Sequence, residues 1–383
     1  MIIKNYFGEK HTNKTSIKGL SRRFKKVFLE LSTEIKSPKK TLNVLSKNFI
    51  FNFKLKDLQK FKKFKTIVII GMGGSILGTE AIYNFLEKKI DKKIYFFNDL
   101  NIKKISSFKK EVNLKKTLVF VISKSGNTIE TLSNAFVLNI IKKNSKNVIL
   151  ISEKNDSILF DLSKKMNLFY IEHKKNIGGR YSVLSEVGIA PAYLMGINVS
   201  KLRSKTLAYL KGEKKKFLKE SSIKLAKFLK GNKFKNLIFL NYSPELEKFL
   251  FWCQQLIAES LGKKNKGFLP MISNVPKDHH SLLQLYLDGP KDKIFYVFSL
   301  HEDLKQKINI KNKTIFKNYL HQKKLTTIKN AQKKALIKVL KIRKIPFRDF
   351  QIKKINEEVL SELFSYFILE TIIIGKLTKI NPF

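Results

Sequence analysis

The sequence predicts an α/β protein with two doubly wound, mostly parallel sheet domains in tandem and helical N- and C-terminal segments. Three observations lead to this prediction. Continuous apolar runs of strand length recur, as in strands buried on both faces. Stretches of helical periodicity alternate with them, in two blocks separated by a Lys-rich, helical stretch at roughly 198–231. A length of 383 residues is sufficient for two domains with separate cores.

The first block follows an N-terminal region, residues 1–60, that is predicted to be helical and amphipathic, as in SRRFKKVFLELSTEIK. Strand-like apolar runs then alternate with helix-length stretches. These runs cover 66–71, 92–99, 117–123 and 146–152. The N-terminal helices and the first sheet are expected to form a domain of residues 1–205.

The second block repeats the alternation without any repeat at the level of the sequence. Its strand-like runs are 236–243, 293–300 and 345–352. The clearest helix is ELEKFLFWCQQLIAESLG, residues 245–262, and a further helix is expected near the C-terminus. The second domain is expected to span residues 206–383.

The composition is that of a globular protein, with 43% hydrophobic and 28% charged residues. No apolar run approaches the roughly 20 residues of a membrane helix, and the nearest candidate, 364–377, contains Glu370. The N-terminus has no signal-peptide core, so a cytoplasmic protein is expected. A single cysteine, Cys253, excludes an intrachain disulfide and a Cys-rich metal site, and its apolar neighbours predict a buried thiol.

The formal charge of +47 raises the alternative of a nucleic-acid-binding protein. Only six of the 77 basic residues are arginine. Nucleic-acid-binding proteins favour arginine for bidentate hydrogen bonds to phosphates and bases. The lysines are also spread along the whole chain instead of gathering in one segment. We therefore expect no specific nucleic-acid partner and attribute the charge to the coding bias of an AT-rich genome.

Two loops at the predicted carboxyl ends of strands are suited to an anion, because ligands of open α/β sheets bind at that edge. The first is GMGGSILG, residues 71–78, called the glycine loop below. Its Gly74 and Ser75 precede a helix, so backbone N–H groups can approach a phosphate. Tight glycine turns also occur for packing alone, and this alternative stays open.

The stronger signal is SKSGNT, residues 123–128, called the hydroxyl loop below. Ser123, Ser125 and Thr128 supply hydroxyls, Lys124 supplies a positive charge, and the next helix supplies its N-terminal dipole. A helix N-cap by Thr128 is the alternative, and it accounts for one hydroxyl but not for three. The loop is therefore predicted to bind a phosphate-sized anion.

Two further segments carry candidate catalytic groups. NIGGRYS places Arg180 directly after a glycine pair, where a guanidinium can lie close to backbone and substrate; a surface salt bridge is the alternative. QQLIAESLGKK places Gln255 and Glu259 at i, i+4 on one helix face. Apolar neighbours are expected to desolvate Glu259, as is common for a general base, and a solvent-facing carboxylate is the alternative.

The segment KDHHSLLQLYLDGP contains His279 and His280. Adjacent side chains on a helix point roughly 100° apart, so the two are poorly placed to chelate one metal. An acid–base role for one of them is favoured, and no metal site is predicted.

Six segments together resemble the glucose-6-phosphate isomerase family. They are GMGGSILG, SKSGNTIET, GGRYSVLSEVG, QLIAESLGK, DHHSLLQLYLDGP and GKLTKINPF, in the family's order across residues 71–383. The resemblance implies two tandem sugar-isomerase domains. It also implies an aldose–ketose isomerase of glycolysis and gluconeogenesis, which interconverts glucose 6-phosphate and fructose 6-phosphate by proton transfer through a cis-enediol.

The resemblance further implies roles for the candidate residues. Glu259 is the base, Arg180 stabilises charge on the intermediate, and His280, reaching the site from a partner subunit, assists ring opening. Gln255 helps to position the substrate. The phosphate lies on Ser123, Lys124, Ser125 and Thr128, with Gly74 and Ser75 near the sugar. A homodimer is thus implied, and neither a metal nor an organic cofactor is.

Two features depart from the family pattern. Gly126-Asn127 stands where many members have a bulkier residue and a second hydroxyl, and Gly-Asn-Thr also occurs in the branch that isomerises mannose 6-phosphate as well. Members continue beyond NPF with a lysine that helps to open the sugar ring, which neither Lys376 nor Lys379 matches. Either the natural chain continues further, which we expect, or this protein does without that lysine.

Two alternatives to a glucose-6-phosphate isomerase stay open on the sequence. A dual phosphoglucose and phosphomannose isomerase would account for the Gly-Asn-Thr sequence. A non-catalytic phosphosugar-binding regulator would need the hydroxyl loop, but not Glu259 or His280.

Overall fold

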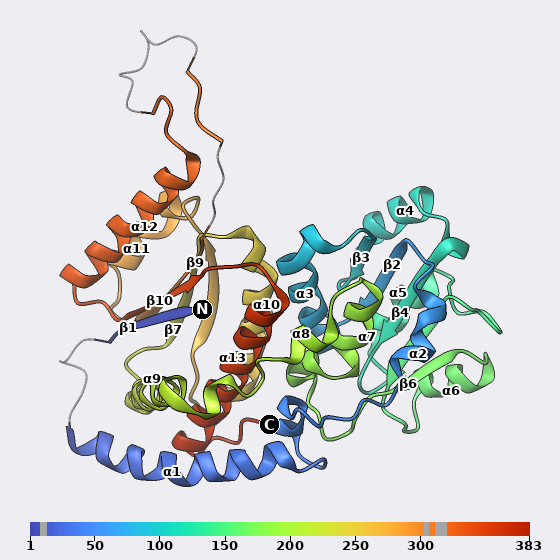
Figure 1. The fold of residues 1–383 in the computed structure, drawn as a ribbon, viewed down its shortest axis with the longest axis horizontal. Helices are drawn as coiled ribbons and strands as arrows, with labels where there is room; N and C mark the ends of the chain where they lie inside the picture. Colours follow the sequence, from blue (N-terminus) through green and yellow to red (C-terminus); the bar gives the residue numbers. More distant parts are fainter. Residues whose placement is uncertain (8–13, 302–305, 311–319) are drawn as a thin grey trace.

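Two five-stranded sheets form the centre of the computed structural model, which describes residues 1–7, 14–301, 306–310 and 320–383 (Figure 1). The first sheet is parallel throughout, with the strand order β3-β2-β4-β5-β6. Every residue of β4 is buried, which accounts for its continuous apolar sequence. The strands are β2 (Thr66–Gly71), β3 (Lys93–Phe97), β4 (Thr117–Ile122), β5 (Val148–Ser152) and β6 (Phe169–Glu172).

Helices cover both faces of the first sheet. Side chains of α4, α5 and α6 pack on one face, and those of α3 and α7 pack on the other. The helices of this half are α2 (Leu55–Leu58), α3 (Leu77–Leu86), α4 (Ile102–Glu111), α5 (Ile129–Val137), α6 (Ile158–Lys165), α7 (Glu186–Leu194) and α8 (Val199–Arg203). Short 3-10 helices are Thr41–Leu45, Gln59–Phe61, Gly73–Ser75, Glu87–Lys89, Leu114–Lys116, Gly179–Leu184, Ala208–Leu210 and Pro244–Leu246.

The second sheet has the order β1-β10-β9-β7-β8, in which β1 is antiparallel and the other strands are parallel. Its strands are β1 (Ile2–Tyr6), β7 (Asn236–Asn241), β8 (Leu269–Asn274), β9 (Lys293–Leu300) and β10 (Phe347–Ile352). The surrounding helices are α1 (Lys14–Lys36), α9 (Gly212–Gly231), α10 (Glu247–Leu261), α11 (His279–Leu287), α12 (Leu325–Ile342) and α13 (Glu357–Thr378).

One apolar core joins the two halves. It contains the inner faces of both sheets together with residues of α1, α3, α7, α9, α10 and α13. Figure 1 shows α3 and α10 between the two sheets, where they pack against each other. The outer face of the second sheet has a separate core beneath α11 and α12. The α10 helix, which carries Glu259, is thus fixed from both sides.

The predicted α/β class with two mostly parallel sheets is confirmed, and the runs at 66–71 and 293–300 coincide with β2 and β9. Four elements differ. The N-terminal region is not helical throughout, because β1 (Ile2–Tyr6) pairs with β10, a partner that local sequence does not reveal. The strands β6 and β8 were not predicted. The expected helix at 198–231 is interrupted, and α9 begins only at Gly212, whose φ is +60°.

The expected domain boundary after residue 205 stays a prediction. The structure adds one fact that bears on it: β1 lies at the edge of the second sheet, whereas α2 packs beside the first. Any division into domains therefore has to assign the N-terminal strand to the C-terminal sheet.

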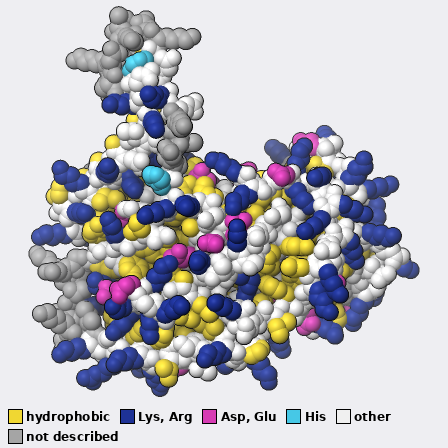
Figure 2. Space-filling model, viewed as in Figure 1, with side chains coloured by type: hydrophobic (Ala, Val, Ile, Leu, Met, Phe, Trp, Pro, Cys, Tyr) yellow, Lys and Arg dark blue, Asp and Glu magenta, His cyan; other side chains and the backbone are white. Residues whose placement is uncertain are grey.

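Among the described residues, no helix is both long and apolar enough to cross a membrane. Cys253 is fully buried and unpaired, as predicted. Figure 2 shows Lys and Arg side chains scattered over the visible face and interleaved with apolar patches. The charge on this face is thus dispersed in space as well as along the sequence.

Candidate active site

The glycine loop lies at the carboxyl end of β2 and packs against two other candidate segments. Gly73 has a φ of +51°, and a Cβ there would lie 2.9 Å from the Gln255 Nε2 atom. A Cβ at Gly74 would lie 2.2 Å from the carbonyl carbon of Gly179. The positive φ favours glycine at position 73, and close backbone packing requires it at position 74. The loop thereby contacts α10 and the segment that carries Arg180. Ser75 ends this turn and is buried.

Arg180, Gln255 and Glu259 form one hydrogen-bonded group, called the carboxylate cluster below. The Arg180 Nη1 atom donates to Glu259 Oε2 at 2.9 Å. Gln255 Nε2 donates to the other carboxylate oxygen, Oε1, at 3.1 Å. The predicted i, i+4 pair on α10 thus places both residues on one face, and each oxygen of Glu259 has a fixed donor.

The surroundings of the Glu259 side chain differ from those that the sequence predicted. Its side chain is 49% exposed, and its hydrogen-bond partners are polar, so the expected desolvation by apolar neighbours is not found. The reason is the orientation of α10, which turns its apolar residues toward the core and this face toward the glycine loop. The carboxylate is therefore both oriented by the protein and accessible to a ligand.

The hydroxyl loop follows β4 directly. Ser123 Oγ lies 2.8 Å from Thr128 Oγ1 and 3.4 Å from Ser125 Oγ, so the three predicted hydroxyls are neighbours. Thr128 is the N-cap residue of α5, but its hydroxyl bonds to Ser123 instead of to the helix backbone. The N-cap alternative is therefore wrong for this hydroxyl. Gly126 has a φ of +73°, which lets the chain turn within the loop.

Lys124 lies on the same loop with its side chain 33% exposed. Its ammonium group pairs with Glu153 at 3.3 Å. Glu153 directly follows β5, the strand next to β4. The lysine is therefore held at the carboxyl edge of the sheet, although part of its charge is already compensated.

The pairing of the first sheet joins the hydroxyl loop to the carboxylate cluster. Gly71, the last residue of β2, is paired with Ile122, the last residue of β4. The glycine loop and the hydroxyl loop therefore start side by side. Because the glycine loop also contacts Gln255 and the backbone at Gly179, the predicted anion site and the predicted base belong to one continuous surface.

The histidine pair lies apart from this surface within one chain. His280 is at the exposed start of α11 and makes no side-chain hydrogen bond to any described residue. His279 lies against Tyr242, whose hydroxyl is 3.4 Å from Nε2. Burial lowers the pKa of His279, and the neighbouring His280 adds to the effect. The structure thus brings nine of the ten predicted site residues to the carboxyl edge near the first sheet, and His280 is the exception.

Comparison with known proteins decides the family. Residues 33–374 match the model of a family described as phosphoglucose isomerase. The chain belongs to the phosphoglucose isomerase family. It is 33% identical over 356 residues to a probable glucose-6-phosphate isomerase of Methanococcus maripaludis, covering 89% of this chain and 80% of that protein. It is 32% identical over 339 residues to the glucose-6-phosphate isomerase of Methanocaldococcus jannaschii, covering 85% of this chain and 83% of that protein.

The solved structures agree on the fold of this phosphoglucose isomerase family member. A crystal structure of a glucose-6-phosphate isomerase from Chlamydia trachomatis superposes with a TM-score of 0.77 at 17% identity. The match covers 100% of this chain and 84% of that one. At this identity the likeness shows the fold alone.

Two residues that the sequence analysis missed hold Arg180 of this family member in place. The Arg180 Nε atom donates to Ser260 Oγ at 2.8 Å, and the Tyr181 hydroxyl lies 2.7 Å from the same oxygen. Arg180 Nη2 and the Tyr181 hydroxyl both donate to the Pro382 carbonyl, at 2.8 and 2.6 Å. Burial raises the pKa of Tyr181, so its hydroxyl stays protonated as a donor. Tyr181 directly follows Arg180 and Ser260 directly follows Glu259, and this adjacency in the sequence could have identified both residues.

Metal ligation was not predicted for this site. The part of the chain that the structure describes contains no group of three or more His, Cys, Asp and Glu residues with suitable geometry. The polar groups of the candidate site are instead hydroxyls, one amide, one carboxylate and cationic side chains.

Proposed function

We propose that this chain is a glucose-6-phosphate isomerase, which interconverts glucose 6-phosphate and fructose 6-phosphate. Membership of the phosphoglucose isomerase family supports the proposal. The observation that carries it is the carboxylate cluster, because moving a proton between adjacent carbons needs one accessible base with an electrophile beside it. We also propose a role in glycolysis and gluconeogenesis and a cytoplasmic location, both of which are inferred from the proposed reaction.

Glu259 is the proposed base. Its carboxylate takes the proton from C2 of the open-chain aldose and returns it to C1, through a cis-enediol. The two donors, Arg180 and Gln255, bind one oxygen each and so fix the plane of the carboxylate. A base that is held in position contributes to the rate through orientation as well as through proton affinity.

Arg180 balances the charge during this transfer. Before the transfer, its guanidinium faces the Glu259 carboxylate at 2.9 Å. When Glu259 accepts the proton, the negative charge moves to the oxygens of the substrate, next to the same guanidinium. Because Ser260 and the Pro382 carbonyl hold the other nitrogens, Arg180 faces one negative charge before and after the step without reorganising.

The hydroxyl loop is the proposed phosphate site. Three neighbouring hydroxyls can rotate to donate to phosphate oxygens, and Lys124 adds a positive charge. The hydroxyls also bond to one another, which fixes the shape of the loop. The site is therefore formed in advance, and binding costs little ordering.

A coupled assay tests the proposed function directly. Glucose 6-phosphate and mannose 6-phosphate are supplied side by side, and formation of fructose 6-phosphate is measured. Turnover of glucose 6-phosphate with release of tritium from C2 is the expected result. Turnover of both sugars would identify the dual isomerase, and binding without tritium release would identify a non-catalytic regulator.

Ser123→Ala combined with Thr128→Ala is expected to raise the KM for the phosphorylated sugar by about 10- to 100-fold, since two hydrogen bonds to a charged group are lost. The hydrogen bonds of these hydroxyls stay within the loop, and the Gly126 N–H that donates to Ser123 Oγ keeps its bond to the Ser123 carbonyl, so the protein should stay folded. Steady-state kinetics measure the effect. Ser106→Ala with Ser107→Ala, two exposed hydroxyls on α4, is the control and should leave the KM unchanged. An unchanged KM in the loop variant would rule out the proposed phosphate site.

We also propose a homodimer in which each site receives His280 from the partner subunit. His280 is exposed and lies just after β8, an edge strand whose Leu269 and Met271 side chains are 61% and 43% exposed. Leu285 on α11 is exposed as well. An unpaired strand edge flanked by apolar side chains favours contact with another chain.

Subunit mixing tests this arrangement. Glu259→Gln and His280→Ala chains are each expected to be inactive, and a heterodimer of the two contains one site with both groups intact. Random exchange at equal amounts should therefore restore about a quarter of wild-type activity, because half of the dimers are heterodimers with one working site. Native mass spectrometry verifies the exchange. If activity does not return after verified exchange, His280 does not act across the interface.

A further inference from the structure

The two sheets correspond strand by strand. Both contain four parallel strands in the same relative order, β3-β2-β4-β5 in the first and β8-β7-β9-β10 in the second. The register of the central ladders agrees too: Gly71 pairs with Ile122 at the end of β2 and β4, and Asn241 pairs with Phe298 at the equivalent point of β7 and β9. The strand β9 therefore occupies the position of β4, although the sequence shows no repeat.

This register places Ser299 at the position of Ser123. Each serine is the residue after the last paired position of its ladder, and each is buried. The hydroxyl loop that follows Ser123 is not repeated after Ser299, where β9 continues through Leu300. A cation from another element occupies this place instead: Lys333 of α12 donates from Nζ to Ser299 Oγ at 2.8 Å.

A cavity of about 500 Å³ lies at this point, at the carboxyl ends of β9 and β10. Its volume is in the range of roughly 300–1,000 Å³ that small-molecule sites occupy. Ligands of open α/β sheets bind at the carboxyl edge of the strands, as is proposed for the first sheet. The polar side chains that line the cavity are Ser299, His301, Asn330, Lys333, Gln351, Lys353 and Lys354.

The charge around the cavity favours an anion. Burial lowers the pKa of Lys333, and Asp349, whose charge partly opposes this effect, is the nearby carboxylate. Asp349 is buried and its Oδ2 accepts from Gln351. Lys353 and Lys354 have no ion-pair partner among the described residues. Among the described residues, three ammonium groups thus surround the cavity against one carboxylate. An anion beside Lys333 would offset the cost of burying its charge.

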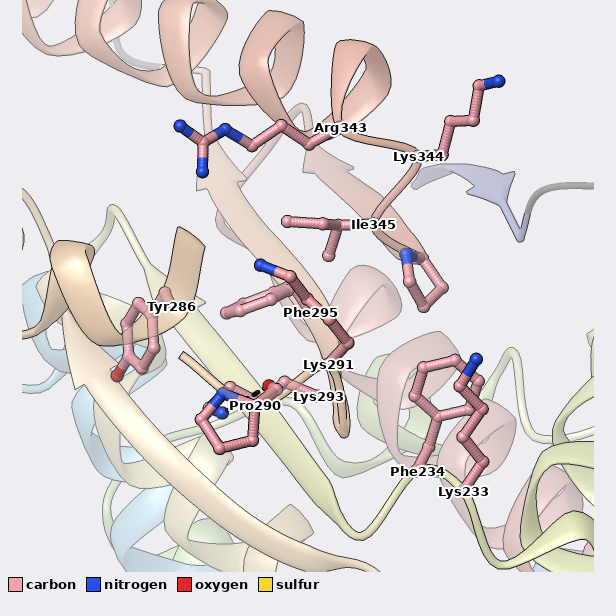
Figure 3. Close-up of a pocket in the computed structure, with 11 residues that line it drawn as sticks. Lys233, Phe234, Tyr286, Pro290, Lys291, Lys293, Phe295, Arg343, Lys344 and Ile345 are labelled. Carbon is pink, nitrogen blue, oxygen red and sulfur yellow. Dashed lines mark hydrogen bonds between the residues drawn. The ribbon is translucent and has the colours of Figure 1, made fainter. Parts of the chain in front are cut away.

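A second basic cavity, of about 220 Å³, lies at the opposite, amino-terminal edge of the same sheet (Figure 3). Three of the five cations that line it are already bound by the protein, whereas Lys233 and Lys344 have no ion-pair partner among the described residues. Arg343 pairs with Asp288, and Lys293 pairs with Asp292 at 2.8 Å. Lys291 donates to a backbone carbonyl of α11. This cavity is therefore less suited to an added anion than the one at the carboxyl edge.

We propose that the cavity at the carboxyl ends of β9 and β10 is a second anion site, which binds the phosphate group of a small phosphomonoester beside Lys333 and Ser299. The proposal rests in part on the proposed role of the hydroxyl loop, because Ser299 is equivalent in register to Ser123, a residue of that loop. The site is separate from the carboxylate cluster, so its occupant is an effector of the enzyme and not its substrate.

Binding of inorganic phosphate to the full chain, measured by isothermal titration calorimetry at low ionic strength, tests the proposal. The wild type is expected to bind two phosphates per chain. Lys333→Met should weaken the second site at least about tenfold, the loss expected for one charge-assisted hydrogen bond. Ser123→Ala with Thr128→Ala should lose only the first site. Lys338→Met removes an equal charge from an exposed position on the same helix and should leave both sites intact.

The outcomes separate this proposal from the proposed function. One phosphate per wild-type chain, lost in the hydroxyl-loop variant, overturns the second site and leaves the active site as proposed. The second site is also overturned if Lys333→Met binds two phosphates per chain with the affinity of the wild type. If Lys333→Met loses one bound phosphate and the hydroxyl-loop variant loses none, the second site is supported and the first is contradicted. If Lys333→Met fails to fold by circular dichroism, Lys353→Gln with Lys354→Gln replaces it, and unchanged affinity there overturns the proposal.

Discussion

Glu259→Gln is expected to lower kcat by roughly 10²–10⁴-fold, the contribution of a positioned acid or base. The substitution preserves the geometry of the carboxylate cluster. The amide oxygen can still accept from Arg180. Gln255 presents Nε2 to this position, and a turn of its amide by 180° lets Oε1, which has no hydrogen-bond partner in the described structure, accept from the new amide nitrogen. Proton affinity is therefore the property that changes, and substrate binding should be retained.

The measurement combines kcat from the coupled assay, tritium release from C2 and the affinity for fructose 6-phosphate by calorimetry. Glu220→Gln, an exposed carboxylate on α9, is the matched control and should leave all three unchanged. A variant at Glu259 that turns over at near the wild-type rate would show that another group is the base. A large loss of affinity with little loss of kcat would show a positioning role.

The features that local sequence determines were predictable. β2 and β4 are buried on both faces, so their apolar runs identify them without knowledge of their partners. The hydroxyl loop was predictable because three hydroxyls and a lysine follow one such strand directly. The pair Gln255 and Glu259 followed from helical spacing, and the structure places them on one face.

The features that depend on distant pairing were not predictable. β1 is a short edge strand of half-buried residues, and only its register with β10, more than 300 residues away, makes it a strand. The solvent exposure of Glu259 depends on how α10 is turned against the glycine loop. Ser299 corresponds to Ser123 only through the register of the two strand ladders. The residue types in the two segments do not reveal that register.

The second prediction with a large expected effect concerns a buried ion pair. Arg348 of β10 is fully buried and pairs with Glu370 of α13 at 2.8 Å. Its Nε atom donates to the Asn5 side chain of β1 at 2.9 Å, and its Nη2 atom donates to the Tyr366 hydroxyl. Glu370 also accepts from Ser221 of α9 at 2.6 Å. This network joins the edge of the second sheet, including β1, to two of the helices that cover it.

Glu370→Gln is expected to lower the free energy of unfolding by about 3–5 kcal/mol, the cost of leaving a buried charge without its partner. The side chain keeps its size, so the loss reflects charge and not a cavity. Replacing both partners, with Arg348→Met and Glu370→Leu, should recover most of the stability, because no charge then remains buried. Urea unfolding at a fixed protein concentration measures all variants.

Glu358→Gln on the same helix is the control for the loss of a carboxylate, and its effect should be small because no hydrogen bond to its side chain is present in the described structure. Two results would contradict the prediction. A single variant within about 1 kcal/mol of the wild type would show that Arg348 is compensated by its other contacts, such as the Tyr296 and Phe350 rings. A double variant as unstable as the single one would show that packing around the pair, and not its charge, sets the stability of the second sheet. Because the network does not touch the carboxylate cluster, kcat below the unfolding transition should stay at the wild-type value in either case.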